Sequence, residues 1–247
     1  MKTFKKLIAL LIFPAFLIGI GITTNSCSKD DSAKDPVYTC ATCSTTPQAL
    51  AANDASVKGI YKGIVVGSTG TLSINIQNGS STITGTMVLD GVSVALTSNV
   101  AVVDGQTYVA PFTGTYNGSP ISITFSIGLS GSTPTVTSSN IPGHPNAIFN
   151  LYKETSTSLI EAFEGTYSKT GETGTFNILL SRAISKWGYV VKKDGSNTTD
   201  SGSGTINGSS QLILEGRTIA TITGDQLKGS FVDSNNSTIT VTGKRTL

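Results

Sequence analysis

The chain has few side chains suited to acid–base or nucleophilic catalysis. His144 is the sole histidine among 247 residues. It lies in Pro142-Gly143-His144-Pro145, a rigid turn in which a surface position is the simplest expectation. No serine stands in a strand-to-helix elbow, and the acids needed as a catalytic pair by a glycosidase stand mostly beside turn-forming residues. These residue types favour a non-enzymatic protein without a cofactor or a metal site.

Two acidic groups leave alternatives open. Glu161 and Glu164 are three residues apart and could share one face. However, Ser158-Leu159-Ile160-Glu161 has the spacing of a capping box, which predicts one short helical turn. Asp233-Ser234-Asn235-Asn236 offers oxygen ligands for a calcium ion, although a plain hairpin loop is the simpler interpretation. Neither group establishes a reaction.

Aromatic residues supply the other candidate for recognition. Trp187 is the sole tryptophan, and Tyr189 follows two positions later. The two rings could form an exposed platform that binds a sugar or a protein. On a strand, a tryptophan is more often half-buried in a core. Trp187 and Tyr189 are therefore a possible ligand platform, with a core position as the alternative.

The beginning of the chain carries the clearest signal. Lys2, Lys5 and Lys6 precede an apolar run over residues 7–22, which contains Pro14. This run is shorter than the ~20 residues that span a bilayer comfortably. A basic start followed by a short apolar core is typical of a secretory signal peptide. An uncleaved membrane anchor is the alternative.

Ser26-Cys27, just after the apolar run, resembles the lipobox of bacterial lipoproteins, although Thr24 stands where leucine is usual. Lys29-Asp30-Asp31 resembles the signal that sends Bacteroidetes lipoproteins to the outer face of the outer membrane. The resemblance implies that residues 1–26 are removed and that Cys27 carries the lipid. Two or more acyl chains suffice for stable anchoring. The expected location is the outer membrane, facing the cell exterior; an ordinary cleaved signal peptide is the alternative.

If Cys27 is lipidated, Cys40 and Cys43 remain as a pair in an oxidising compartment. A local disulfide between them is then the expected state. A zinc site would need two further ligands, and a thioredoxin-type motif would need a strand-to-helix setting. Free thiols are the remaining alternative.

Composition limits the class of partner. The chain has a net charge of +2 and only 13% charged residues. Without Lys2, Lys5 and Lys6, 14 of the 17 basic residues remain against 15 acids, so the net charge becomes about −1. This balance lacks the basic field that dominates nucleic-acid binding, so no nucleic-acid partner is expected.

The pattern from residue 58 onward predicts an all-β protein. Short alternating segments such as 71–76 are separated by turn signals such as Asn78-Gly79. We expect two similar antiparallel β-meander halves, either small barrels or a sandwich, after a flexible tether in which residues 48–52 form a short helix. The expected organisation is a signal peptide over 1–26, a lipidated tether with the C-x-x-C over 27–57, and β-rich repeats over 58–154 and 155–247.

Three sequence matches suggest the repeat. They pair residues 59–61 with 165–167, 70–74 with 174–178, and 114–118 with 204–208. Chance similarity is the alternative, because glycine and threonine are common in this chain. The Gly-x-Tyr segments at 59–61 and 165–167 also resemble the Gly-x-Trp opening of lipocalin-like barrels, which implies a β-meander that closes on itself.

The functional expectation is a surface-anchored lipoprotein that serves as a binding or accessory module of an outer-membrane complex. Its partners would be the membrane, through the lipid anchor, and another envelope protein or a glycan. A carbohydrate-binding or carbohydrate-active surface protein is one alternative. A structural envelope component is the other.

Overall fold

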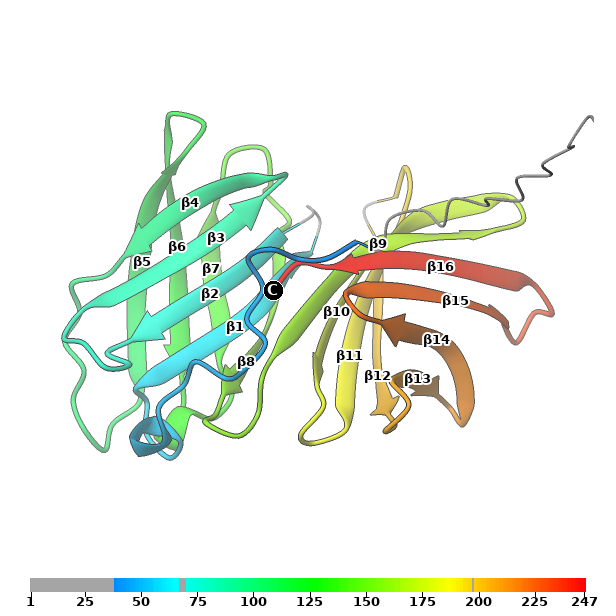
Figure 1. Cartoon of the computed structure of the whole chain (residues 1–247). Helices are drawn as coiled ribbons and strands as arrows, with labels where there is room; N and C mark the ends of the chain where they lie inside the picture. Colours follow the sequence, from blue (N-terminus) through cyan, green and yellow to red (C-terminus); the bar gives the residue numbers. More distant parts are fainter. Residues whose placement is uncertain (1–37, 67–69, 197) are drawn as a thin grey trace, which may run out of the picture. The chain divides into compact units, whose positions relative to one another are not determined.

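The computed structural model describes residues 38–66, 70–196 and 198–247. Sixteen β-strands make up almost all of the regular structure in these residues. The described helical pieces are two short 3₁₀ turns, η1 (Ala51–Asn53) and η2 (Leu129–Gly131). No helix in the described part of the chain is long and apolar enough to cross a bilayer. The predicted all-β fold is confirmed (Figure 1).

Strands β1 to β8 form the first sheet, in the order β7-β6-β5-β4-β3-β2-β1-β8. Neighbouring strands are antiparallel, and β8 returns to pair with β1, where Leu151 lies opposite Gly63. The sheet is therefore a nearly closed barrel whose seam lies between β7 and β8. Its strands are β1 (Gly59–Val66), β2 (Gly70–Ile76), β3 (Ile83–Leu89), β4 (Val92–Thr97), β5 (Tyr108–Tyr116), β6 (Ser119–Ile127), β7 (Thr135–Asn140) and β8 (Ile148–Glu154).

Alternation along these strands places apolar side chains inside the first sheet. In β5, Tyr108, Ala110 and Phe112 are buried, whereas the residues between them are exposed. This period of two is the one that a strand imposes. Phe125 of β6 contacts two rings edge-on, with centroids 5.4 Å from Tyr61 and 6.0 Å from Phe112. Large, fully buried side chains therefore fill this interior.

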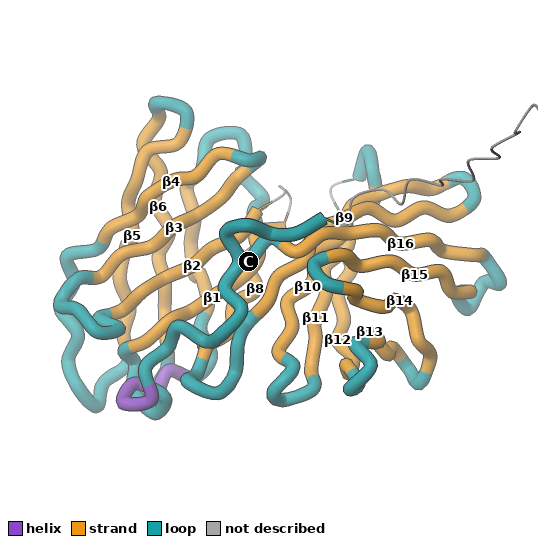
Figure 2. The backbone as a smooth tube through the Cα atoms, in the orientation of Figure 1, coloured by secondary structure: helices purple, strands orange, loops and turns teal. Residues whose placement is uncertain are grey.

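Strands β9 to β16 form a closed antiparallel barrel, in which β16 pairs back with β9. The tube in Figure 2 shows the short turns that join successive strands. Closure gives every strand two neighbours and so limits the free sheet edges that are otherwise sites of aggregation. The strands are β9 (Glu161–Lys169), β10 (Glu172–Ser181), β11 (Lys186–Lys193), β12 (Thr199–Ile206), β13 (Gln211–Leu214), β14 (Arg217–Thr223), β15 (Gln226–Val232) and β16 (Thr238–Arg245).

The two halves share one strand order, because in each the eighth strand pairs with the first. The first two sequence matches fall on equivalent strands, β1 with β9 and β2 with β10. The third match does not, because residues 114–118 end the fifth strand of their sheet whereas 204–208 end the fourth strand of theirs. Asn-Gly favours a hairpin turn wherever it occurs, so this third match reflects turn chemistry rather than equivalent position.

A small apolar cluster joins the first sheet to the barrel. Ile64 and Val66 of β1 pack with Ala162, Leu179 and Val190 of β9, β10 and β11. All five side chains are less than 9% exposed. The outer face of the barrel is therefore partly buried here, which explains why β10 has a buried run rather than a strict alternation.

Residues 38–57 differ from the flexible tether that their composition indicates. Val57 belongs to the core of the first sheet, and the backbone N–H of Leu50 donates to Asn78 Oδ1 at 3.0 Å. The phenol of Tyr38 donates to the carbonyl of Arg245 at 3.0 Å. The predicted helix over 48–52 is replaced by the shorter η1. Specific hydrogen bonds thus hold residues 38–57, whereas residues 27–37 of the predicted tether lie outside the described residues.

Glu154 anchors several of these elements. Its carboxylate is fully buried and accepts the ammonium of Lys62 at 2.7 Å. It also accepts the backbone N–H groups of Gln48, at 2.7 Å, and Ile160, at 3.1 Å. These three donors compensate for the desolvation of a buried charge. The carboxylate thereby connects the segment before η1, strand β1 and the entry to the barrel.

Candidate ligand-binding cavity

Trp187 and Tyr189, the predicted aromatic platform, both face the interior of the barrel. The Trp187 side chain is only 2% exposed, and its Nε1–H donates to the carbonyl of Thr205 at 3.0 Å. The two ring centroids are 5.5 Å apart, with the planes tilted by 33°. The structure therefore shows an internal aromatic pair on β11 rather than an exposed platform.

Glycines opposite these rings determine how the rings lie. Trp187 pairs across the strands with Gly204, and Tyr189 pairs with Gly202. A Cβ atom would lie 2.8 Å from the indole at position 204, and 2.7 Å from the phenol ring at position 202. Tyr167 lies in the same way over Gly174. Each ring therefore occupies the space that a side chain would take on the neighbouring strand.

Rings placed over glycines lie along the wall and leave the centre of the barrel open. The result is a cavity of about 390 Å³, near the lower end of the volumes typical of ligand sites. Its apolar lining includes Phe176, Ile178, Val191, Leu227 and Val241. An eight-stranded barrel is just wide enough either to be filled by side chains or to hold one small ligand. The interior of this barrel is therefore not completely filled by side chains.

No family model, curated protein or solved structure matches this chain significantly. The function must therefore be inferred from the site itself.

Polar side chains gather at one end of the cavity, which we call the mouth. Glu172 lies between two lysines, 3.6 Å from Lys169 Nζ and 3.3 Å from Lys193 Nζ. The phenol of Tyr167 donates to Glu172 Oε1 at 3.0 Å. This hydrogen bond is the main cause that lowers the pKa of Glu172, with the lysines assisting. Burial, followed by the same hydrogen bond, raises the pKa of Tyr167 to about 12.

Asp200 lines the mouth on the neighbouring strand β12. It lies opposite Val191 of β11. Val191 is in turn the inward-facing residue next to Lys193 on that strand. Burial raises the pKa of the Tyr189 phenol, and the negative charges of Asp200 and Glu215 raise it further. Within the described residues, Asp200 forms no ion pair shorter than 4.0 Å. The lysines at the mouth thus have ion-pair partners, whereas Asp200 has none among the described residues and accepts only the backbone N–H of its neighbour Ser201, at 2.8 Å.

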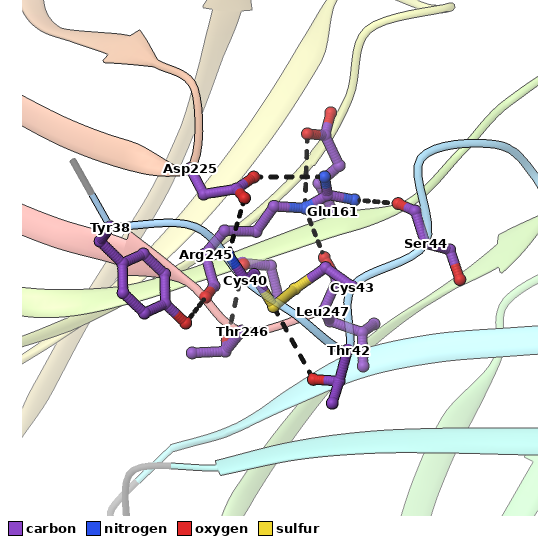
Figure 3. The surroundings of a disulfide bond; sticks show 11 residues. Tyr38, Cys40, Thr42, Cys43, Ser44, Glu161, Asp225, Arg245, Thr246 and Leu247 are labelled. Carbon is purple, nitrogen blue, oxygen red and sulfur yellow. Dashed lines mark hydrogen bonds and ion pairs between the residues drawn. A yellow bond between two sulfur atoms is a disulfide. The ribbon is translucent and has the colours of Figure 1, made fainter. Parts of the chain in front are cut away.

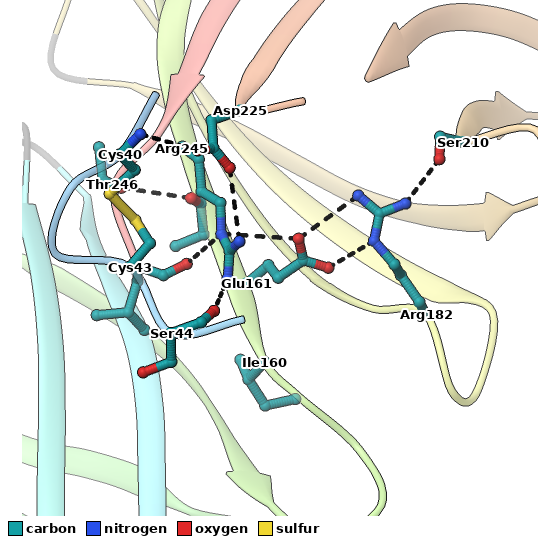
Figure 4. A network of polar contacts seen from close by, with 12 residues as sticks. Cys40, Cys43, Ser44, Ile160, Glu161, Arg182, Ser210, Asp225, Arg245 and Thr246 are labelled. Carbon is teal, nitrogen blue, oxygen red and sulfur yellow. Dashed lines mark hydrogen bonds and ion pairs between the residues drawn. A yellow bond between two sulfur atoms is a disulfide. The ribbon is translucent and has the colours of Figure 1, made fainter. Parts of the chain in front are cut away.

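The opposite end of the barrel, which we call the base, carries an arginine–carboxylate network. Figure 4 shows Glu161 between two arginines. Its carboxylate is 2.7 Å from Arg182 Nε and 3.6 Å from Arg245 Nε. Arg245 also lies 3.5 Å from Asp225. The predicted capping role of Glu161 is wrong, because residues 161–169 form β9. Ser158 instead shares a hydrogen bond with Ser181.

A disulfide joins Cys40 to Cys43 beside this network, as predicted (Figure 3). The backbone N–H of Cys40 donates to Asp225 Oδ2 at 2.8 Å, and Arg245 donates to the carbonyl of Ser44. The bridged loop is therefore bound to the base of the barrel. Cys27, the predicted lipidation site, lies outside the described residues.

The other candidates from the sequence do not gather at a site. His144 was expected at the surface, but its side chain is only 10% exposed, with Nε2 3.3 Å from Asp90 Oδ2. Its ring packs edge-on against Tyr116. Asp233 accepts hydrogen bonds from the backbone N–H groups of Asn235 and Ser237. The segment considered for calcium is therefore a hairpin loop. Within the described residues, no group of three or more potential ligands could hold a metal ion.

The charged residues at the mouth are not singled out by sequence reasoning. Isolated lysines and acids near strand ends are common on surfaces, so Glu172 and Asp200 give no local signal. The glycines give a partial sequence signal, because in Ser201-Gly202-Ser203-Gly204 they alternate with serine. A strand of this kind places both glycines on one face, which is the pattern that makes room for rings from a neighbour.

Proposed function

We propose that this protein is a non-enzymatic, lipid-anchored binding protein whose β9–β16 barrel holds one small, mainly apolar molecule. The observation that carries the proposal is the cavity of about 390 Å³ inside the barrel, with aromatic and aliphatic walls and polar groups at one end. Sites for small molecules have this composition: an apolar enclosure with a few polar groups that fix orientation. The sequence at Ser26-Cys27 supports the anchor.

The charged groups described here favour binding over catalysis. Glu172 is already engaged by Tyr167 and by both lysines at the mouth. A general base should instead be free to take a proton from a substrate, with a pKa near the working pH. The pKa of Glu172 is shifted in the opposite direction, downward. The mouth is therefore suited to orienting a ligand.

Titration of the purified full chain carrying Cys27→Ser tests this function. Trp187 is the sole tryptophan and lines the cavity, so its fluorescence reports on occupancy directly. We expect 1-decanol to change the Trp187 emission saturably, with a matching heat in calorimetry. Cellobiose, as a carbohydrate probe, should produce neither signal. Absence of any saturable response to 1-decanol would overturn the proposal.

Cavity-filling variants locate the binding. Val241 lines the cavity, and Val241→Phe should lower the affinity for 1-decanol by at least about tenfold, because the added ring occupies the ligand's space. Ile239→Phe, which also narrows the cavity, is a second variant in case the first fails to fold. Val232 is 44% exposed, so Val232→Phe is the matched control. Equal losses in the lining and control variants would contradict binding inside the barrel.

A further inference from the structure

The mouth of the barrel is asymmetric in charge. Four successive strands each contribute one charged side chain to the cavity lining: Lys169, Glu172, Lys193 and Asp200 on β9, β10, β11 and β12. The remaining strands contribute apolar groups there, including Leu214, Phe231 and Ile239. A ligand with one polar group would therefore direct that group toward β9–β12.

The two lysines are already partnered by acids. Lys169 lies 3.6 Å from Glu172 and 4.0 Å from Asp233. Lys193 lies 3.3 Å from the second oxygen of Glu172, which draws its ammonium toward β10. An incoming anion would have to compete with these carboxylates. The lysines therefore offer little net attraction for a negative group.

Asp200 has a different environment. It lacks an ion pair among the described residues, and it lies next to the aromatic pair, with Gly202 and Tyr189 in the adjacent inward positions. The faces of aromatic rings attract cations, and the attraction is stronger where the cation is desolvated. A carboxylate without an ion-pair partner, beside the tilted rings of Tyr189 and Trp187, is suited to a positive group on an otherwise apolar ligand.

The edge of β12 adds acceptors at the same place. Pairing between β12 and β13 covers only Thr205 and Ile206, because β13 is four residues long. Residues 199–204 pair with β11, so their other edge has no strand partner in the described structure. An unpaired edge presents backbone carbonyls as well as N–H groups, and these carbonyls accept hydrogen bonds from an ammonium.

From these observations we propose that the ligand is an amphiphile with a protonated amine, whose ammonium binds Asp200 beside Tyr189 while its apolar part fills the barrel. This inference rests on the proposed binding function and adds the chemical class of the ligand. Attraction between the ammonium and Asp200 at the half-open mouth should weaken as salt increases, because exposed charges are screened over about 10 Å at 0.1 M ionic strength.

Three ten-carbon probes test the proposal on the full chain carrying Cys27→Ser: decylammonium, 1-decanol and decyl sulfate, each below its micellar concentration. We expect decylammonium to bind about three- to tenfold more tightly than 1-decanol at low salt, and decyl sulfate more weakly than either. Trp187 fluorescence and calorimetry provide the readouts. Equal or tighter binding of the sulfate, or no preference for the ammonium over the alcohol, would overturn the inference.

Asp200→Asn assigns the preference to one residue. It should reduce the affinity for decylammonium to about that for 1-decanol, a loss larger than any change in the affinity for 1-decanol itself. Asp104→Asn is the matched control, because Asp104 is an exposed carboxylate of the first sheet, paired with Lys58 at 3.2 Å. An equal loss for all three probes in Asp200→Asn would indicate a structural effect and contradict the assignment. If 1-decanol itself fails to bind the unaltered barrel, the proposed function fails; if it binds without an ammonium preference, only this inference fails.

Discussion

Trp187 lies directly across from Gly204, and a Cβ atom at position 204 would lie 2.8 Å from its indole ring. Where a larger residue would turn the indole toward the barrel axis, glycine lets it lie along the wall. The first sheet has the same strand order, but large buried side chains such as Tyr61 and Phe125 fill its interior. Inward glycines occur in both halves, but leucine side chains such as Leu151 lie over them in the first sheet, whereas aromatic rings lie over them in the barrel.

Substitution of these glycines should have graded effects. At position 204 a Cβ would also collide with the carbonyl of Ile213, whereas at 202 the three nearest atoms all belong to the Tyr189 side chain. We expect Gly204→Ala to lower the free energy of unfolding by about 3 kcal/mol and Gly202→Ala by about 1 kcal/mol, within the usual range for overpacking. Gly208→Ala is the control, because a Cβ there has open space. Urea denaturation measures all three, and an equal cost at 202 and 204 would contradict this explanation.

Lys62 and Glu154 form a buried ion pair whose loss should be severe. Lys62→Met leaves the carboxylate of Glu154 buried without its cation, at an expected cost of about 3–5 kcal/mol. The melting temperature should fall by roughly 2–4 °C for each kcal/mol in a chain of this size. Lys58→Met removes an exposed pair with Asp104 and should cost less than about 1 kcal/mol. Similar melting temperatures for the two variants would argue against a structural role for Glu154.

Acid should lower the free energy of unfolding, because it protonates Glu172 at the mouth of the barrel. Its folded pKa is lowered, chiefly by the Tyr167 hydrogen bond. The associated stability is therefore present above the unfolded pKa, near 4.5, and is lost as pH falls through the lower folded value. Tyr167→Phe should raise the pKa of Glu172 toward its usual range. The stability difference between wild type and Tyr167→Phe should then be larger at pH 7 than at pH 3 by thermal unfolding, and a difference independent of pH would refute the coupling.

The Tyr167 phenol should show the complementary behaviour in base. Burial, followed by the hydrogen bond to Glu172, raises its folded pKa to about 12 from its ordinary value of about 10. The raised pKa of Tyr167 contributes stability that is complete below pH 10 and is lost as pH rises through about 12. Spectrophotometric titration of the tyrosines should show late-titrating groups in wild type that include Tyr167 and Tyr61, whose pKa is raised by burial. In Glu172→Gln the Tyr167 group should move part of the way toward its ordinary range while the Tyr61 group stays late, and Glu164→Gln serves as the control.

Membrane attachment depends on Cys27 in the proposed function. Cys27→Ser should abolish labelling by a palmitate analogue and move the protein from the membrane fraction to the soluble fraction, because one acyl chain or none gives marginal anchoring. Cys43→Ser should retain both the label and the membrane association. Unchanged membrane retention of Cys27→Ser would exclude a lipid anchor at this residue.

The local sequence pattern was enough to predict the all-β fold, because apolar and polar side chains alternate along each strand and Asn78-Gly79 marks a turn. It was also enough to predict the Cys40–Cys43 bridge from cysteine number and spacing. The cavity depends on register, since Gly204 matters only because pairing places it opposite Trp187. Glu161 illustrates the same limit: a local capping motif predicted a helical turn, but pairing with β10 and the two arginines placed this residue in a strand.

The binding of residues 38–44 at the base has a consequence for orientation. Tyr38 contacts Arg245, at the end of β16, whereas Lys169 and Glu172 lie at the other end of the barrel, where β16 begins. The N-terminal segment thus joins the barrel at the end opposite the mouth. Residues 38–44 therefore bind at the base and leave the mouth uncovered by this segment.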